Sequence, residues 1–366
     1  MSEPRGRNLK SLFKRMPAFS SGAIPDARIL GVSMDSRRVR PGWLFAAIKG
    51  ESANGYDYIP QALANGAAAV MGSLPAPAGL AVPYIQIDGD IHAAVAYLAA
   101  ALHDFPARKL RMIGVTGTDG KTTTTSMIYH ILRCAGIRVG MISTVSAQIG
   151  ERVLDTGFHV TTPEAPDIQG YLAEMVRAGL THCVLETTSH GLVQGRVTAC
   201  DFDAAVITNV THEHLDYHGS YENYLRAKGL LFESLAQTPR KRVGNLRAAV
   251  LNKDDQSYAY LKRVSPARQV SYSMLNEADL WADEIDNQPE ELAFTCRFGK
   301  EKTLRVRTPM TGIYNVSNSL AALGLCVNLL GVPAETAVRA LASMPGVPGR
   351  MERIDLGQPF SAIVDF

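Results

Sequence analysis

Residues 110–136, which read LRMIGVTGTDGKTTTTSMIYHILRCAG, constrain the fold of this chain more than any other stretch. They predict a short apolar strand, a glycine-bearing turn and a helix. Gly117 and Gly120 let the backbone turn tightly, and backbone N–H groups at the positive end of a helix form a phosphate site. In this interpretation Lys121 adds a positive charge for the outer phosphates, and Thr122 adds a hydroxyl for a magnesium ion.

The spacing of this loop departs from the strict P-loop pattern, G-x-x-x-x-G-K-[ST]. The first glycine of that pattern would fall at position 115, where Val115 stands, so the loop is a variant that reads T-G-T-D-G-K-T-T. The alternative is a glycine-rich turn between a strand and a helix, with a lysine on its surface. The expected strand before G-K-T-T and the expected helix after it favour the phosphate site.

Composition and charge exclude several classes of protein. The length of 366 residues predicts two or more domains, and a hydrophobic content of 46% is ordinary for a globular protein. A net charge of +2 gives no basis for nucleic-acid binding, and no apolar run approaches the roughly 20 residues of a membrane span. The five cysteines are scattered without a C-x-x-C pair, which indicates reduced thiols in a cytoplasmic protein. The basic residues that open the chain read as a frayed, solvated terminus: Arg5, Arg7, Lys10, Lys14 and Arg15.

The order of the expected strands and helices predicts an α/β protein in three parts. Residues 1–107 form a small N-terminal α/β domain. Residues 108–346 alternate strand and helix, which predicts a P-loop-type, mainly parallel, doubly wound sheet. Residues 347–366 read as two strands, the second of which stops in mid-strand, so we expect the stub of a third α/β domain.

Two polar side chains follow expected buried strands of the central part. Strand 182–186 ends at Glu186, and strand 203–209 ends at Asn209. Because ligands of open α/β sheets bind outside the carboxyl ends of the strands, the phosphate loop, Glu186 and Asn209 should share one rim. A carboxylate there is suited to Mg²⁺, although Glu186 is otherwise a helix N-cap or a surface acid.

The segment 211–219, THEHLDYHG, is rich in side chains that bind metals. Nothing downstream completes a zinc site, so a magnesium site with one histidine beside phosphates is the more coherent interpretation. At least one of the three histidines reads as a surface residue. Lys228 on its own reads as a solvated charge on an amphipathic helix, and Arg350 and Asp365 are either nucleotide contacts or surface residues.

Together these motifs resemble the Mur ligases, over the chain from about Met34 to Phe366. The strings SHGLVQGRV (189–197) and HLDYHG (214–219) are most similar to the member that adds the third amino acid of the peptidoglycan stem peptide. The resemblance implies an ATP-dependent ligase of cell-wall synthesis. Its reaction would join meso-diaminopimelate or L-lysine to UDP-MurNAc-L-Ala-D-Glu through an acyl phosphate.

The resemblance also implies roles for individual residues. ATP would be bound by Thr116, Gly117, Thr118, Asp119, Gly120, Lys121, Thr122, Thr123, Asn315, Asn318, Arg350 and Asp365. Mg²⁺ would be bound by Thr122, Glu186, His214 and a carbamylated Lys228. The catalytic residues would be Lys121, Lys228 and His214. The UDP-sugar peptide would be contacted by Met34, Ser36, Glu51, Ser52, Ala53, Thr161, Thr162, Thr188, Gln194 and Arg196.

Two alternatives stand beside this interpretation. The first is another Mur or folylpolyglutamate-type amide ligase, against which the residues of the UDP site argue. The second is a non-catalytic remnant that binds ATP or a UDP-sugar, against which the intact Lys121, Glu186, His214 and Lys228 argue. For the ligase we expect a cytoplasmic monomer without membrane insertion, whose partners are its substrates.

Two departures from the family pattern matter. Asp119 stands where the family usually has asparagine, and an extra negative charge near phosphates should weaken ATP binding unless it faces a cation. The expected third domain, which holds the family's amino-acid pocket, is missing beyond its first strands. The choice between diaminopimelate and lysine is therefore expected to depend on that domain, and we expect the chain alone to ligate poorly.

Overall fold

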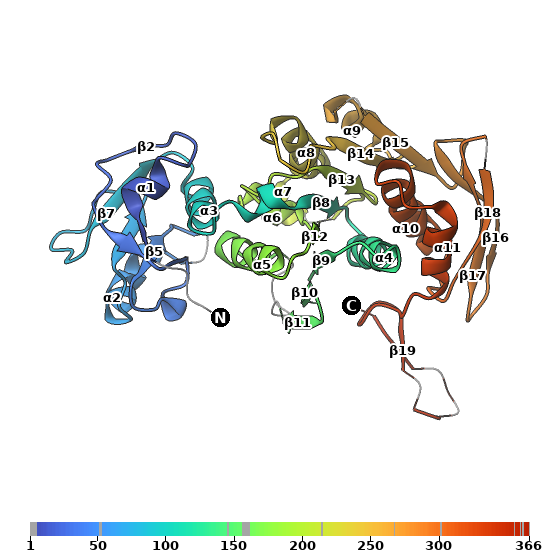
Figure 1. Cartoon of the computed structure of the whole chain (residues 1–366), viewed down its shortest axis with the longest axis horizontal. Helices are drawn as coiled ribbons and strands as arrows, with labels where there is room; N and C mark the ends of the chain where they lie inside the picture. The colour runs from blue at the N-terminus through green and yellow to red at the C-terminus, as the bar shows by residue number, and fades with distance from the viewer. Residues whose placement is uncertain are drawn as a thin grey trace. The chain divides into compact units, whose positions relative to one another are not determined.

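The structure is a computed structural model (Figure 1). It describes residues 6–50, 53–144, 146–155, 162–213, 215–266, 268–300, 302–354, 356–358, 360 and 362–365. The chain divides into two compact units. The first unit consists of Met1–Ala107, Pro163–Ala173 and Gln194–Cys200, and the second of Arg108–Thr162, Glu174–Val193 and Asp201–Phe366. The domain boundaries expected from the sequence remain a prediction.

The first unit contains a five-stranded sheet in the order β2-β7-β6-β5-β4, in which β4 to β7 are parallel and β2 is antiparallel to β7. Alternate side chains of β5 enter two separate apolar clusters: Leu44 lies in one and Phe45 in the other. The sheet is therefore covered on both faces, as parallel sheets usually are. The strands of this unit are β1 (Arg7–Asn8), β2 (Ser20–Ser21), β3 (Arg28–Ile29), β4 (Gly31–Ser33), β5 (Trp43–Ala47), β6 (Ala69–Gly72) and β7 (Tyr84–Asp88), of which β1 and β3 pair with each other in a separate two-stranded sheet. Its helices are α1 (Leu9–Phe13), η1 (Ser36–Arg38), η2 (Gly55–Tyr58), α2 (Ile59–Ala64) and α3 (Ile91–Leu102), and η3 (Pro106–Lys109) follows.

The N-terminal segment is ordered from residue 6 onward, so the prediction of a frayed terminus is wrong there. Helix α1 buries Leu9 and Leu12, and the Asn8 side chain caps its first turn. Arg7 and Arg15 both pair with Asp104, and the hydrogen bond from Arg7 is the main reason that the pKa of Asp104 falls to about 2. The acid that holds these arginines lies about ninety residues away in the sequence, and local sequence patterns carry no signal for such a pair.

The second unit is built on an eleven-stranded sheet in the order β11-β10-β9-β12-β8-β13-β14-β15-β16-β17-β18. All pairs from β9 to β16 are parallel, and antiparallel strands extend both edges. The predicted α/β fold with a mainly parallel sheet is confirmed. The strands are β8 (Arg111–Thr116), β9 (Val139–Ile142), β10 (Ser146–Ile149), β11 (Arg152–Asp155), β12 (His182–Glu186), β13 (Ala204–Ile207), β14 (Ala248–Asn252), β15 (Arg268–Ser273), β16 (Leu280–Asn287), β17 (Leu292–Phe298) and β18 (Lys302–Thr308). A separate hairpin pairs β19 (Glu352–Ile354) with β20 (Ala362–Val364).

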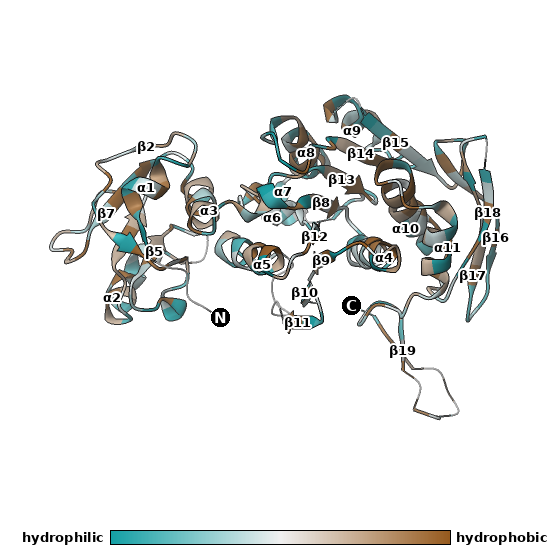
Figure 2. Cartoon of the chain, in the orientation of Figure 1, coloured by the Kyte–Doolittle hydropathy of each residue, from teal (hydrophilic) through white to brown (hydrophobic). Residues whose placement is uncertain are grey.

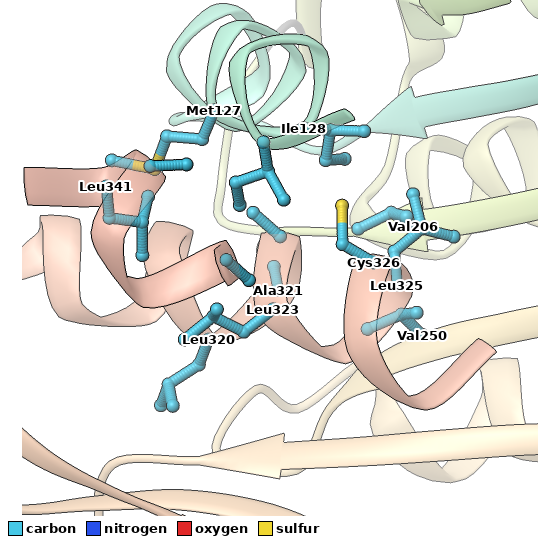
Figure 3. Packing of buried hydrophobic residues seen from close by; sticks show 14 of the residues in the cluster. Met127, Ile128, Val206, Val250, Leu320, Ala321, Leu323, Leu325, Cys326 and Leu341 are labelled. Carbon is cyan, nitrogen blue, oxygen red and sulfur yellow. The ribbon is translucent and has the colours of Figure 1, made fainter. Parts of the chain in front are cut away.

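The core of this unit lies between its sheet and its long apolar helices. Met127 and Ile128 of α4 and Leu320 of α10 belong to one buried cluster with strand residues such as Val206 and Val250 (Figure 3). The second half of α10, Leu320 to Leu323, is hydrophobic (Figure 2), and the helix packs between the sheet and α4. The helices from residue 121 to residue 342 are α4 (Lys121–Cys134), α5 (Ala165–Arg177), α6 (Ser189–Val193), α7 (Leu215–His218), α8 (Tyr221–Gln237), α9 (Tyr258–Val264), α10 (Tyr314–Leu323), the π-helix η4 (Gly324–Leu329) and α11 (Ala334–Ala342).

Among the described residues, no helix combines the length and the apolar character that crossing a membrane requires.

A buried ion pair anchors the start of the central strands. Lys241 Nζ donates to Asp203 Oδ2 at 2.6 Å and to the carbonyl of Leu110 at 3.1 Å, and both charged side chains are fully enclosed. The same Asp203 oxygen accepts the N–H of Met112 in β8 at 2.8 Å. The pair therefore connects the N-terminal ends of β8 and β13 to the segment that follows α8.

We predict that Lys241→Met destabilises the protein by about 3–5 kcal/mol, because it leaves the Asp203 carboxylate buried without its cation. Removing both charges in Asp203→Asn/Lys241→Met should recover part of that loss. Arg307→Ala is the matched control, since the Arg307–Glu291 pair is largely exposed and its loss should cost less than about 1 kcal/mol. Urea unfolding of the variants measures these differences. Equal losses for Lys241→Met and Arg307→Ala would contradict the prediction.

Candidate nucleotide and metal site

The phosphate loop joins β8 to α4 and depends on two glycines. Gly117 has a φ of 155° and Gly120 a φ of 76°, both in the range that favours glycine. A Cβ on Gly117 would lie 1.8 Å from Thr208 Oγ1, and a Cβ on Gly120 would lie 2.2 Å from Asn318 Oδ1. Neither position can carry a side chain unless the neighbouring residues move, so the tight turn predicted from the sequence is confirmed.

The end of β13 holds the loop through its backbone. Asn209 O accepts the N–H of Thr118 at 2.8 Å, and Asn209 Oδ1 accepts the N–H of Asp119 at 3.0 Å. Thr208 Oγ1 donates to Asp119 O at 2.6 Å. The prediction that Asn209 shares a rim with the loop is confirmed. Asp119 is fixed here by its main chain, whereas its side chain is exposed.

Glu186 meets the first turn of α4 at the same rim. Its Oε1 accepts the Thr122 hydroxyl at 3.1 Å, and its Oε2 accepts the N–H of Thr144 at 3.2 Å. The carboxylate is buried, and this burial raises its pKa. The positive charge of Lys121 offsets part of that rise. A buried carboxylate beside a hydroxyl is a pair of hard oxygen donors that gains from a cation, so these residues fit Mg²⁺.

The remaining loop side chains lie against the loop itself. Lys121 Nζ donates to the carbonyl of Thr118 at 2.5 Å. Thr116 and Thr123 are buried in the strand and helix that flank the loop. Asn318 lies beside Gly120, accepts the Thr124 hydroxyl at 3.3 Å and donates to Asn315 Oδ1 at 2.9 Å. The two asparagines expected on the adenine side are therefore linked to each other and to α4.

Lys228 is buried beneath the loop, so its interpretation as a solvated surface charge is wrong. Its Nζ donates to the carbonyl of Gly117 at 2.7 Å and lies 4.2 Å from the centroid of the Tyr224 ring. Burial, reinforced by the positive charge of Lys121, holds the pKa of Lys228 well below its usual range. The sequence alone does not reveal that Lys228 is buried, because the amphipathic pattern of α8 does not show which segments cover each face of the helix.

The histidine-rich segment contributes a buried residue as well as surface ones. His218 Nε2 lies 3.0 Å from Ser189 Oγ and its ring lies 5.1 Å from that of Tyr224, whereas His212 is exposed. His214 lies outside the described residues. In the part of the chain that the structure describes, no group of three or more His, Cys, Asp and Glu side chains forms a metal cluster.

Arg350 and Asp365, the nucleotide contacts expected from residues 347–366, belong to the second unit. Arg350 lies close enough to Glu186 for its charge to oppose the rise in the pKa of that carboxylate. Asp365 is exposed, and its Oδ1 accepts the N–H of Met351 at 3.0 Å.

The residues expected to contact a UDP-sugar peptide fall in both units. In the first unit, Ser36 Oγ donates to Gln61 at 2.7 Å and Arg196 Nε donates to Gln194 Oε1 at 3.0 Å. In the second, the hydroxyls of Thr162 and Thr188 lie 3.0 Å apart. Met34 is half-buried and Ala53 exposed. Three residues expected at this site lie outside the described part of the chain: Glu51, Ser52 and Thr161.

The fold and the loop define a class of nucleotide-binding α/β protein, in which a glycine-bearing turn opens a helix at the carboxyl edge of a parallel sheet. Comparison with known proteins specifies the family. The Mur ligase middle domain matches residues 115–326, and the model described as Mur ligase family, catalytic domain, matches residues 28–108. The chain belongs to the Mur ligase family, whose members are ATP-dependent amide-forming ligases.

Individual relatives agree with this assignment. The chain is 40% identical over 361 residues to UDP-N-acetylmuramoyl-L-alanyl-D-glutamate--2,6-diaminopimelate ligase of Geobacillus thermodenitrificans, covering 98% of the chain and 71% of the relative. It is 42% identical over 351 residues to UDP-N-acetylmuramyl-tripeptide synthetase of Roseiflexus sp., covering 92% of the chain and 67% of the relative. A solved structure of a UDP-N-acetylmuramoyl-L-alanyl-D-glutamate--2,6-diaminopimelate ligase matches with a TM-score of 0.79 and 28% identity, over 96% of this chain and 69% of that one.

We predict that Gly120→Ala weakens ATP binding by about tenfold or more, the equivalent of one or two lost loop hydrogen bonds, because its Cβ displaces Asn318. Gly136→Ala is the matched control. Gly136, just beyond the end of α4, has nearly the same φ, 75°, but nothing lies within 4 Å of an added Cβ. Both variants should lose about 1–2 kcal/mol of stability from left-handed strain, and Gly120→Ala should lose more because its Cβ would lie 2.2 Å from Asn318 Oδ1. Calorimetric titration with ATP separates them, and equal ATP affinities would contradict the prediction.

Proposed function

We propose that this chain acts in the ligation of the third amino acid, meso-diaminopimelate or L-lysine, to UDP-MurNAc-L-Ala-D-Glu. The observation that carries the proposal is the arrangement of Lys121, Glu186 and Lys228 around one phosphate loop, at the carboxyl edge of β8 and β12. The names of the relatives support the substrate, since one names the dipeptide precursor and diaminopimelate and another a tripeptide synthetase.

The chemistry follows from the poor reactivity of a carboxylate. A carboxylate oxygen of D-Glu attacks the γ-phosphorus of ATP, the bond to the β-phosphate oxygen breaks, and ADP leaves. The neutral amine of the incoming amino acid then attacks the acyl carbon, phosphate leaves, and the nitrogen gives up a proton. Lys121 would neutralise charge on the transferred group, and the N–H groups of the loop would orient the phosphates.

Four residues would bind a divalent cation: Thr122, Glu186, His214 and, as a carbamate, Lys228. The buried oxygens of Thr122 and Glu186 carry this part of the proposal, because they are hard donors in an enclosed site. Mg²⁺ held there would neutralise phosphate charge during transfer. Within the chain, Thr122 would orient Glu186 through their 3.1 Å hydrogen bond.

Carbamylation of Lys228 has a physical rationale in its surroundings. An ammonium group would repel a magnesium ion, whereas the carbamate formed with CO₂ is an anion that binds it. Only the neutral amine reacts with CO₂, and burial beside Lys121 lowers the pKa of Lys228 and so favours that neutral form.

We assign the adenine side of the nucleotide to Asn315 and Asn318, and further nucleotide contacts to Arg350 and Asp365. The proximity of Arg350 to Glu186 supports a phosphate role, since its guanidinium suits phosphate oxygens. Two of the three substrates, ATP and the UDP-sugar peptide, are nucleotides, so we place the reaction in the cytoplasm, and we propose a monomer.

The substrate assignment is tested by calorimetric titration of UDP-MurNAc-L-Ala-D-Glu into the chain, with UDP-N-acetylglucosamine as the control ligand. We expect the muramoyl dipeptide to bind at least about tenfold more tightly, because it adds charged contacts that the control lacks. Arg196→Ala should reduce that difference. Equal binding of the two ligands would refute the proposed substrate.

We predict that Asp119→Asn leaves ATP affinity unchanged or raises it by up to about fivefold, since it removes one negative charge near the phosphates. The loop should keep its shape, because Asn209 and Thr208 bind the main chain of Asp119. Titration with ATP measures the change. A clear loss of affinity would show that the Asp119 carboxylate has a role of its own.

A further inference from the structure

Thr208 connects the phosphate loop to the sheet of the second unit. Its hydroxyl donates to Asp119 O at 2.6 Å, and a Cβ on Gly117 would lie 1.8 Å from the same oxygen. Its carbonyl accepts a hydrogen bond from the side-chain amide of Asn252 in β14 at 2.7 Å and another from the hydroxyl of Tyr272 in β15 at 3.0 Å. The proposed function gives Asn252 and Tyr272 no role.

The hydroxyl of Tyr272 has a polar task in an apolar place. Tyr272 is fully buried and belongs to the main hydrophobic cluster of this unit, where phenylalanine would fill the same space. Its hydroxyl shares its proton between Ile207 O at 2.9 Å and Thr208 O at 3.0 Å. A buried tyrosine hydroxyl usually has a hydrogen-bond partner, and here the partners are two successive carbonyls at the end of β13.

These side chains act where the strand ladder stops. The register pairs of β13 with β14 end at Val206, and buried carbonyls beyond that point still need donors. Asn252 and Tyr272 are themselves register partners across β14 and β15, so they lie side by side. Asn252 Oδ1 accepts the N–H of Asp254 at 3.0 Å, which fixes the direction in which its amide donates.

We propose that Tyr272 and Asn252 are positioning residues for the phosphate loop: they fix the main chain at Thr208, whose hydroxyl holds the turn at Asp119. Neither side chain touches the nucleotide in this arrangement, and both act through Thr208. The inference rests on the proposed binding of ATP by the loop. A small displacement of Thr208 would shift the loop N–H groups away from the phosphates, and binding depends on that alignment.

Tyr272→Phe removes the hydroxyl and keeps the ring, so the dissociation constant for ATP should rise about three- to tenfold, the effect of one lost hydrogen bond. Thr238→Val is the matched control. Thr238 is also buried, and its hydroxyl donates to Phe202 O at 2.6 Å, just before the opposite end of β13. Thr238→Val should lose stability as well but should leave the affinity for ATP unchanged.

A double-mutant cycle tests whether Tyr272 acts through Thr208. Thr208→Val removes the hydroxyl that holds Asp119 O, so it should weaken ATP binding by itself. In that background, Tyr272→Phe should weaken binding by less than about twofold more, because the connection is already broken. Thr208→Ser keeps a hydroxyl, and in that background Tyr272→Phe should again have its full effect.

Calorimetric titration measures ATP affinity, and thermal melting measures the stability of each variant. Asn252→Ala tests the same carbonyl through its other donor if Tyr272→Phe does not fold. Wild-type ATP affinity in Tyr272→Phe, or equal losses of affinity in Tyr272→Phe and Thr238→Val, overturns the inference and leaves the proposed function standing. Additive losses in Thr208→Val/Tyr272→Phe also overturn it, since Tyr272 would then act by another route. A wild-type chain that binds no ATP overturns the nucleotide site together with the inference.

Discussion

The parallel pairing of β12, β8 and β13 is the constraint on which the site depends. In this register Glu186 lies opposite Val115 and Ile207 lies opposite Thr116, so all three strands end at nearly the same level. The polar residues at the carboxyl ends of these strands therefore lie on one rim of the sheet, although they are far apart in the sequence. The apolar strands pair because of their hydrophobic side chains and hydrogen bonds, and the assembly of the site is a consequence of that pairing.

Much of this arrangement could be predicted from the sequence, because it depends on strand ends and glycines. The strand before Glu186 has the expected bounds, and Gly120 occupies the expected turn. What could not be predicted depends on contacts between distant segments. The partner of Asp203 is 38 residues away, and the burial of Lys228 depends on the loop that covers it. Strands β10 and β11 are hard to predict from the sequence, because the segment around Gly150 is polar and has the composition of a loop.

Direct pairing, and not the direction of the pKa shift, distinguishes the two buried ion systems of the second unit, because burial raises the pKa of Asp203 as it raises that of Glu186. Lys241 and Asp203 neutralise each other at 2.6 Å and serve the fold. Glu186 and Lys228 are buried with opposite shifts in pKa, each of which favours the neutral form. A protein gains no stability by burying charges in that way. Such a cost is typical of sites that are completed by a ligand or a chemical modification.

The hydrogen bond from Lys121 to the carbonyl of Thr118 has a consequence for the entropy of binding. A free lysine side chain loses up to about 2 kcal/mol of rotamer freedom when it is immobilised. The hydrogen bond to Thr118 O restricts that freedom within the folded chain. Part of the entropy cost of ordering Lys121 is therefore a cost of folding, which leaves less of it to oppose the binding of a phosphate.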